Sequence, residues 1–335
     1  MRKRILLLEN ADPNSIYPDY LPLPEDGDFL NRLRGLGKLT LIRNSAALSA
    51  DERRELLEDC DIYVARHSSV QFSFPAIPER IELVATTTGA VSEFSDFIRA
   101  GGKVTNWGNV SGDTIGYAAL VLLFAALHDL AWQVVNIREN GWEFNTPGGT
   151  MRNLRIGIYG LGHIGRRFAE LARPFGPKLS FFDPYATDSP ADLVRANSLS
   201  DLFSSSQAIV VCAGLTAETR RSVTAELLAM LPDQGIFINV ARGDIVEEAA
   251  LFAELRRGRL RAGLDVIAPP DRLPGDHPLR QCRNVLFTAH NCAHNRWNPP
   301  AIPPNEVRCL EEIARHLAGK SPLSQITVEK LQHMT

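Results

Sequence analysis

The stretch that decides the fold is "RIGIYGLGHIGRRFAE", from Arg155 to Glu170. Three of its glycines, Gly160, Gly162 and Gly165, stand in the order G-x-G-x-x-G. The apolar residues before the first glycine predict a strand, and the amphipathic residues after the last predict a helix. A strand, a glycine turn and a helix in this order are typical of a loop that holds phosphate groups at a helix N-terminus.

An acidic residue further along gives this motif the context of a dinucleotide site. Asp183 ends the next predicted strand, eighteen residues after Gly165, and an interval of about 20 is expected. Its carboxylate would accept hydrogen bonds from the adenosine ribose and repel a 2′-phosphate, which favours NAD over NADP. A structural turn beside a surface aspartate and a methyltransferase loop are the alternatives. The NAD contacts that we predict around this motif and at the neighbouring strand ends are Gly160, Gly162, His163, Ile164, Gly165, Asp183, Ala213 and Ala241.

Length and composition limit the class of protein. A chain of 335 residues exceeds one ordinary core, so we expect two domains. Hydrophobic residues make up 44% and charged residues 22%, as in soluble globular enzymes. A net charge of -3 does not favour a nucleic-acid partner. The five scattered cysteines form no C-x-x-C, which favours reduced thiols and a cytoplasmic protein.

Two apolar runs are too short for a signal peptide or a membrane span. Residues Ile5 to Leu8 are fewer than the about 7–15 of a signal peptide, so we interpret them as a buried strand. The run from Ile115 to Leu127 is shorter than the roughly 20 residues of a span. It belongs to a predicted helix that starts near Ser111 or Asp113 and stops by Gly141. That helix is either a domain connector in a subunit interface or an ordinary core helix, and we expect no membrane partner.

Strand-like and helix-like segments alternate along the first hundred residues and again from Leu154. This βαβα order predicts parallel sheets with helices on both faces. Ser49 is a predicted N-cap, and a final helix is expected from about Asn305 to Gly319. Polar residues end three strands of the second series: Arg242, Asp265 and His290. Each alone has an ordinary structural explanation, but carboxyl ends of parallel strands meet at one edge, where ligands bind.

Several segments together resemble the NAD-dependent D-2-hydroxyacid dehydrogenases. The resemblance is strong over 105–288, clear again in the last helix, and weaker over the first hundred residues. It is carried by "GLGHIG" with Asp183, "LTAET" (215–219), "INVARGDIVEEAAL", "GLDV", "HPL" (277–279), "NVLFTAH" and "HLAGKSPL".

The resemblance implies an α/β protein of two doubly wound parallel-sheet domains. A flavodoxin-like substrate domain would comprise 1–107, completed by 300–335. A Rossmann domain that binds NAD, inserted at 108–299, explains why the glycine motif comes late. The resemblance also implies a homodimer that acts on a small 2-hydroxy or 2-keto acid.

It implies a chemistry as well: hydride transfer between NAD(H) and the substrate. His290 would exchange a proton with the substrate oxygen, and Arg242 would bind its carboxylate and polarise its carbonyl. Backbone amides at Gly89, Ala90 and Val91 would bind the rest of the carboxylate. Asp265 would lie beside the nicotinamide.

The chain departs from the family pattern after "GLDV". The family usually has a glutamate there, hydrogen-bonded to the histidine. With one extra residue before Pro270, Asp271 takes that position; without it, Pro270 does and the carboxylate is lost. Cys292 replaces a glycine, and a metal at His290, Cys292 and His294 lacks a fourth ligand, so no metal is expected. These departures leave a second hypothesis, an NAD-binding sensor or interaction protein with weak or no dehydrogenase activity.

Overall fold

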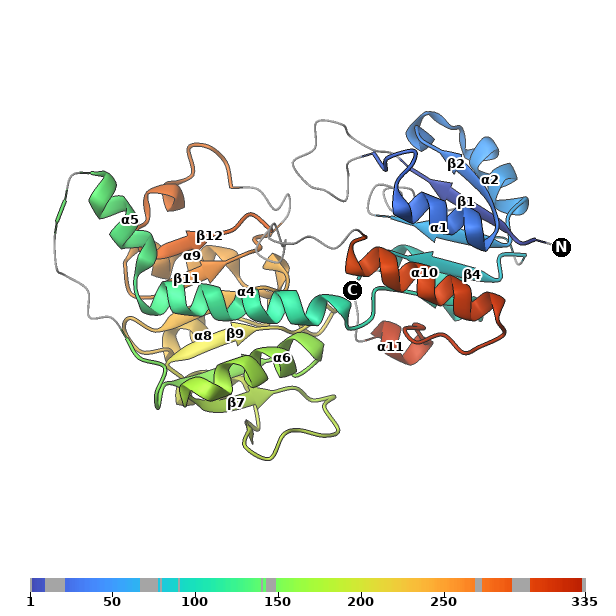
Figure 1. The fold of residues 1–335 in the computed structure, drawn as a ribbon. Coiled ribbons are helices and arrows are strands. Elements are labelled where there is room, and N and C mark those ends of the chain that lie inside the picture. Colours follow the sequence, from blue (N-terminus) through green and yellow to red (C-terminus); the bar gives the residue numbers. More distant parts are fainter. Residues whose placement is uncertain are drawn as a thin grey trace. The chain divides into compact units, whose positions relative to one another are not determined.

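A computed structural model gives the fold of the chain, which divides into two compact units. The first unit comprises Met1–Ser111 with Arg296–Thr335, and the second comprises Gly112–Asn295. Each is an α/β unit with one parallel sheet (Figure 1), as the sequence predicts. The described residues are 2–9, 22–66, 78, 80–89, 91–139, 141–142, 149–268, 273–290 and 302–332.

The sheet of the first unit has five strands in the order β2-β1-β3-β4-β5, the flavodoxin-like order. Every residue of β3 and β4 is buried, as expected for parallel strands that are covered on both faces. The strands are β1 (Arg4–Leu8), β2 (Lys38–Ile42), β3 (Ile62–Ala65), β4 (Leu83–Thr86) and β5 (Val104–Thr105).

Helices cover both faces of this sheet. The apolar sides of α1 and α10 join one core cluster with β1, β3 and β4, and α2, α3 and α11 contribute to the cluster on the other face. Ser49 caps α2 as predicted, in a capping box with Glu52. The helices are α1 (Asp28–Leu36), α2 (Ala50–Glu58), α3 (Ser95–Arg99), α10 (Pro304–Leu317) and α11 (Val328–Gln332).

The sheet of the second unit has seven parallel strands in the order β12-β11-β10-β9-β6-β7-β8. The order reverses between β6 and β9, which is the switch point where doubly wound sheets bind dinucleotides. The strands are β6 (Arg155–Tyr159), β7 (Lys178–Phe182), β8 (Val194–Arg195), β9 (Ala208–Val211), β10 (Ile236–Asn239), β11 (Arg261–Leu264) and β12 (Val285–Phe287).

Two clusters of buried residues lie on the two faces of this sheet. The cluster on one face contains α4 and α6, and that on the other contains α7, α8 and α9. The helices of the unit are α4 (Val110–Leu127), which begins at the end of the first unit, α5 (Leu130–Arg138), α6 (His163–Ala172), α7 (Leu199–Ser205), α8 (Ala225–Met230) and α9 (Glu248–Arg256).

The prediction of one continuous helix from about Ser111 to Gly141 is wrong. Two helices, α4 and α5, meet there at a bend of 58°. Asp129 has a φ of 53°, in the left-handed region, so the helix ends before it and a new one starts. No single helix in the described part of the chain is long and apolar enough to cross a membrane; by length and composition only this bent pair could. The two-residue strands β5 and β8 and the five-residue helices α3 and α11 were not predicted.

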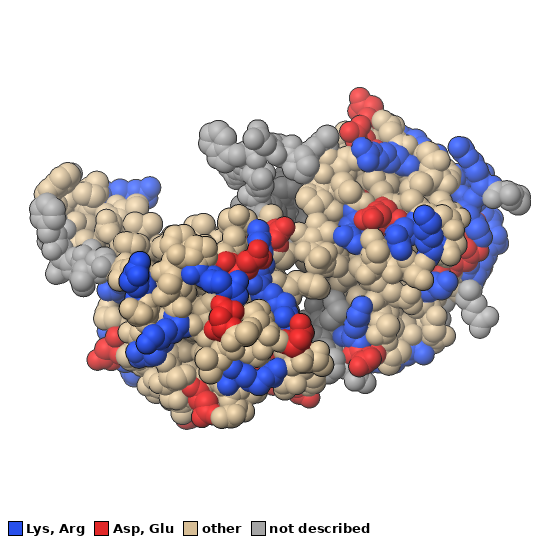
Figure 2. Space-filling view, turned by 60° about the horizontal axis from the view of Figure 1, so that its bottom comes forward, with Lys and Arg blue, Asp and Glu red and all other residues tan. Residues whose placement is uncertain are grey.

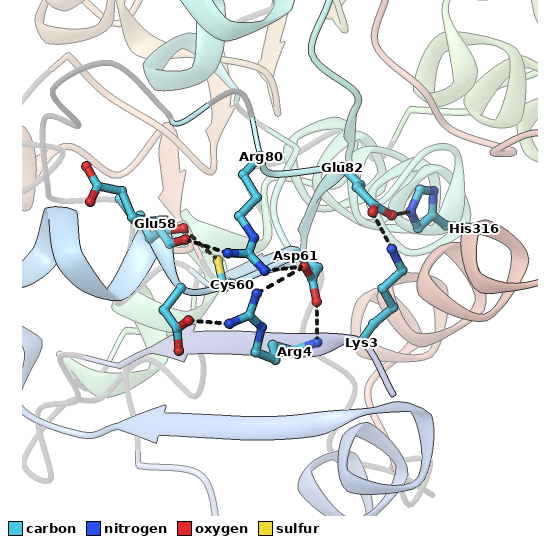
Figure 3. Close-up of polar contacts among 10 residues, drawn as sticks. Lys3, Arg4, Glu58, Cys60, Asp61, Arg80, Glu82 and His316 are labelled. Atoms are coloured by element: carbon cyan, nitrogen blue, oxygen red, sulfur yellow. Dashed lines mark hydrogen bonds and ion pairs between the residues drawn. The ribbon is translucent and has the colours of Figure 1, made fainter. Parts of the chain in front are cut away.

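Charged side chains of both signs are interspersed over the face of the molecule in Figure 2. At the amino ends of the strands of the first unit they form an exposed network (Figure 3). The Asp61 carboxylate accepts a hydrogen bond of 2.7 Å from the backbone N–H of Arg4, and Glu82 pairs with Lys3 and with His316, the latter at 3.1 Å. This network ties β1, β3, β4 and α10 together at their solvent-exposed ends.

Candidate active site

The glycine motif turns from β6 into α6 at the carboxyl edge of the seven-stranded sheet. Gly160 has a φ of +91°, and a Cβ there would lie 2.5 Å from the backbone of Ala213 at the end of β9. A Cβ on Gly165 would lie 2.2 Å from the Gly160 carbonyl oxygen. Both positions therefore require glycine. Gly162 is different, because nothing lies within 4 Å of where its Cβ would be.

The open space beside Gly162 fits a pyrophosphate. His163 and Ile164 begin α6, and the first N–H groups of a helix have no partner within it. These donors and the helix dipole attract an anion. The residues present therefore fit the phosphate groups of a dinucleotide.

Asp183 follows β7 and is bound to the loops around it. One carboxylate oxygen accepts from the Leu161 N–H at 2.7 Å, and the other accepts from the N–H groups of Tyr185 and Ala186 at 2.9 and 3.2 Å. Three neutral donors thus position this carboxylate at the glycine motif without cancelling its charge. Arg195, which we did not predict, supports the loop by donating to the carbonyl oxygen of Asp183 at 2.6 Å and to that of Ala186.

Arg242 follows β10 on a turn that is shaped by Asn239. The buried Asn239 side chain donates to the carbonyl oxygen of Arg242 at 3.0 Å and accepts from the Ala241 N–H at 3.0 Å. The half-buried Arg242 guanidinium donates to the Ala241 carbonyl oxygen at 2.7 Å. The role of Asn239 was also missed, although a polar residue at the end of a buried strand is a signal that could have indicated it.

Asp265 and His290 follow the neighbouring strands β11 and β12 and are joined to each other. The backbone N–H of His290 donates to the backbone carbonyl oxygen of Asp265 at 2.6 Å. The buried Asp265 carboxylate accepts from the hydroxyl of Thr288 at 2.6 Å. Ala289 and His290 both have positive φ, at 49° and 55°. Such backbone strain is typical of functional sites. His290 is exposed.

The first residues of the loop after β11 are held by contacts with α9 and with the turn after β10. Glu248, the first residue of α9, accepts a hydrogen bond of 2.6 Å from the Ala268 N–H. A Cβ on Gly243 would lie 1.9 Å from the carbonyl carbon of Ile267, so the turns after β10 and β11 touch. Asp271, which follows in this loop, lies outside the described residues.

The predicted substrate loop belongs to the first unit, after β4. A Cβ on Gly89 would lie 2.5 Å from the Trp107 ring, and the Asn106 side chain donates to the Gly89 carbonyl oxygen at 3.0 Å. Val91 is buried, and Ala90 lies outside the described residues.

The second unit thus brings all the predicted cofactor residues, with Arg242 and His290, to one edge of its sheet. Within the described ranges, no three His, Cys, Asp or Glu residues are grouped to hold a metal; Cys292 and His294 lie outside those ranges. Burial raises the pKa of the Cys212 thiol, beside Ala213, to about 12. That thiol is therefore not a ready nucleophile at neutral pH.

The family model described as "D-isomer specific 2-hydroxyacid dehydrogenase, NAD binding domain" matches residues 120–292. A hydroxypyruvate reductase of Thermotoga maritima is 30% identical over 266 residues, which are 76% of this chain and 85% of that protein. The chain belongs to the D-isomer specific 2-hydroxyacid dehydrogenase family. It is thus an NAD-dependent oxidoreductase with a Rossmann domain. A D-3-phosphoglycerate dehydrogenase of Methanocaldococcus jannaschii is 25% identical over 81% of this chain and 52% of that protein.

Solved structures share the fold of this dehydrogenase along almost its whole length. The holo form of Rhodotorula graminis D-mandelate dehydrogenase superposes with a TM-score of 0.78. The match covers 97% of each chain at 21% sequence identity. The two α/β units of the dehydrogenase are therefore both part of a known fold.

Proposed function

We propose that this dehydrogenase reduces a small 2-keto acid to its D-2-hydroxy acid with NADH, and catalyses the reverse oxidation with NAD. The observation that carries the proposal is the joint position of the glycine motif, Arg242 and His290 at one edge of the seven-stranded sheet. Gly112–Asn295 would hold the cofactor. The first unit, close to the expected 1–107 with 300–335, would supply the substrate domain.

The bound cofactor supplies the hydride for the C2 carbon of the keto acid. His290 donates a proton to the substrate oxygen in reduction and accepts it in oxidation. Arg242 holds the substrate carboxylate through its planar fork and polarises the carbonyl. The amides of Gly89, Ala90 and Val91 bind the remaining carboxylate oxygen.

The supports of these two side chains suit those roles. Asn239 determines the turn from which Arg242 projects, and the hydrogen bond from the backbone N–H of His290 to the carbonyl oxygen of Asp265 fixes the main chain at His290 beside the end of β11. A catalytic group that is held in place loses less entropy when the substrate arrives. Asp265, hydrogen-bonded to Thr288, would lie beside the nicotinamide.

We propose that the Asp271 carboxylate binds the ring nitrogen of His290 that does not face the substrate oxygen. A carboxylate there selects one tautomer and stabilises the imidazolium. Its placement depends on one extra residue before Pro270; otherwise Pro270 takes the position and no carboxylate is present. Asp271→Asn should lower kcat and shift the pH profile of kcat/KM. A variant as active as the parent at every pH would exclude this role.

The substrate is proposed as a small keto acid of the kind for which several relatives are named. Hydroxypyruvate, glyoxylate and 3-phosphohydroxypyruvate are the first probes, because hydroxypyruvate reductases and phosphoglycerate dehydrogenases are among the relatives. The experiment follows the absorbance of NADH with each acid, for the parent and for His290→Ala. The proposal is supported if the parent reduces at least one of these acids and His290→Ala does not. NADH binding without turnover of any acid would favour the alternative, an NAD-binding sensor.

A homodimer is proposed on the exposed apolar residues of α4 and α5. Val121 in α4 is 62% exposed and Ile137 in α5 is 54% exposed, and Trp142, beyond the end of α5, is 77% exposed. Contiguous exposed apolar surface marks interaction sites in soluble proteins, and a second copy is the occupant that we propose. Sedimentation should give twice the chain mass, and Val121→Asp should give a monomer. A monomeric parent would contradict the dimer.

A cytoplasmic location is proposed on the free thiols of Cys60, Cys212, Cys282 and Cys309, since reduced cysteines are typical of that compartment. Labelling of the protein in fractionated cells would test it. Recovery outside the cytoplasm would overturn it.

A further inference from the structure

Two loops stand on either side of the glycine motif. In the sheet, β6 lies between β7 and β9, so the loops after β7 and β9 flank its carboxyl end. Tyr185 belongs to the first of these loops and Glu218 to the second. The Tyr185 hydroxyl donates a hydrogen bond to the Glu218 carboxylate. This contact therefore crosses the end of β6, where Gly160 starts the turn into α6.

Asp183 and Glu218 are both joined to Tyr185 at this end of the sheet: the backbone N–H of Tyr185 donates to the Asp183 carboxylate at 2.9 Å, and its hydroxyl donates to the Glu218 carboxylate. Tyr159, the last residue of β6, packs on Phe182 with ring centroids 6.3 Å apart, and its hydroxyl pairs with Ser222 at 2.9 Å. Burial raises the pKa of Tyr159, and the charges of Asp183 and Glu218 both add to that rise. Tyr159 thus contacts β7, which Asp183 follows, and the loop after β9, which contains Glu218.

The backbones on both sides of the contact are held. Thr219 accepts from the Thr216 N–H at 2.7 Å, and Thr216 accepts from the Glu218 N–H at 3.2 Å. On the other side, the Tyr185 N–H donates to Asp183, and Arg195 donates to the carbonyl oxygens of that loop. The guanidinium of Arg195 thus binds the loop itself, and its centre lies 4.8 Å from the Phe181 ring.

We propose that Tyr185 and Glu218 form a strap beside the adenosine half of the cofactor, and that Glu218 joins Asp183 in rejecting the 2′-phosphate of NADP. The inference rests on the adenosine site proposed at Asp183. A 2′-phosphate carries about two negative charges, so a second carboxylate facing it raises the electrostatic cost of binding NADPH. NADH lacks that group and does not meet this repulsion.

Three variants of the full chain distinguish the effect of the Glu218 charge from the effect of the Tyr185–Glu218 hydrogen bond. Glu218→Gln removes the charge, Tyr185→Phe removes only the hydroxyl, and Asp233→Asn removes an exposed carboxylate from the turn before β10, at the opposite end of the strands. Affinities for NADH and NADPH are measured by fluorescence titration without substrate, at low and high salt. The readout is the ratio of the two dissociation constants.

Glu218→Gln should narrow the preference for NADH by roughly 3–10-fold at low salt, and by less at high salt because salt screens exposed charges. Tyr185→Phe should leave the ratio as in the parent but speed the release of both dinucleotides equally, and Asp233→Asn should change neither. An unchanged ratio in Glu218→Gln, with NADH still bound, would overturn this inference alone. A parent that binds neither dinucleotide would overturn the proposed cofactor site and the inference with it.

Discussion

The two sheets use charged residues differently at their carboxyl edges. In the second unit, the Asp183 carboxylate accepts from three backbone N–H groups. In the first unit, the fully buried Glu9 carboxylate, after β1, pairs with Arg66 and Arg43, each at 2.8 Å. Neutral donors orient a carboxylate and leave its charge for a ligand, whereas arginines neutralise it.

The difference separates a carboxylate that is left charged for the cofactor, at Asp183, from a buried ion-pair network that stabilises the first unit, at Glu9. Arg66 also lies 3.5 Å from Glu306 of α10, so one buried guanidinium links the ends of β1 and β3 to the last long helix. Forming a buried ion pair requires both charges to lose their hydration. Removing one partner then strongly destabilises the fold, because the other charge stays buried without compensation. Changes in the second unit should therefore affect ligands and rate, and changes at Arg66 should affect folding.

The largest expected effect is that of His290→Ala. Turnover should fall about 10²–10⁴-fold, which is the contribution of a positioned acid–base group. NADH affinity should stay nearly intact, because the glycine motif and Asp183 are untouched. Steady-state kinetics and fluorescence titration measure the two effects. Full activity in this variant would exclude the role of His290.

Arg242→Lys is expected to lower kcat/KM for the keto acid by about 10²-fold, a loss typical of removing one preorganised donor. A lysine keeps the positive charge but cannot bind a carboxylate through two parallel N–H groups. The control is Arg220→Lys, an exposed arginine that is paired with Asp244. Equal activity of the Arg242 and Arg220 variants would contradict bidentate binding.

Arg66→Met tests the other half of the comparison. It leaves the buried Glu9 with one arginine fewer, so the free energy of unfolding of the first unit should fall by about 3–5 kcal/mol. Denaturant unfolding measures the loss, and NADH affinity is the control, which should not change. A variant as stable as the parent but with weaker NADH binding would reverse the assignment of the two edges.

Asp183→Ala should narrow the preference for NADH over NADPH by several-fold, since it removes a charge that faces the ribose. The same change removes the acceptor for the Leu161 and Tyr185 N–H groups, so both affinities should also weaken. Asp183→Asn, which keeps an oxygen acceptor, should narrow the preference with less loss of affinity. A parent that prefers NADPH would refute the charge argument.

The smallest effect is expected at the exposed network of Figure 3. Glu82→Gln should change the free energy of unfolding by no more than about 1 kcal/mol, as for surface ion pairs. The hydrogen bond from Lys3 and then His316 lower the pKa of Glu82. A lowered carboxyl pKa stabilises the fold above the ordinary glutamate pKa, and that contribution is lost as pH falls through the folded value. A loss of unfolding free energy in Glu82→Gln as large as that in Arg66→Met would contradict the claim that buried charges contribute more to stability than exposed ones.

Local patterns predicted the strands other than β5 and β8, the glycine motif, and the edge of the sheet to which Asp183, Arg242 and His290 belong. Continuous apolar runs indicate buried parallel strands, and the glycines and the acid after β7 follow a fixed spacing. The sequence did not indicate the break at Asp129, because it depends on one backbone angle inside an apolar helix pattern.

Contacts between distant segments could not be predicted from the sequence either. Arg195 supports the Asp183 loop from an edge strand of two residues, and Asn239 acts on a turn through its side chain alone. The positive φ of Ala289 likewise arises from the surrounding fold, since alanine rarely adopts that region. Propensity and periodicity contain no information on such tertiary contacts.

The central claim is that the carboxyl edge of the seven-stranded sheet delivers a hydride from NADH to C2 of a 2-keto acid. The most direct test supplies NADH carrying deuterium in the transferred position on C4, with the best keto acid of the panel, and analyses the product by mass and chirality. The account predicts a D-2-hydroxy acid with one deuterium at C2, formed by the parent and by His290→Ala only at a greatly reduced rate. A product without deuterium at C2, or of the L configuration, would contradict it.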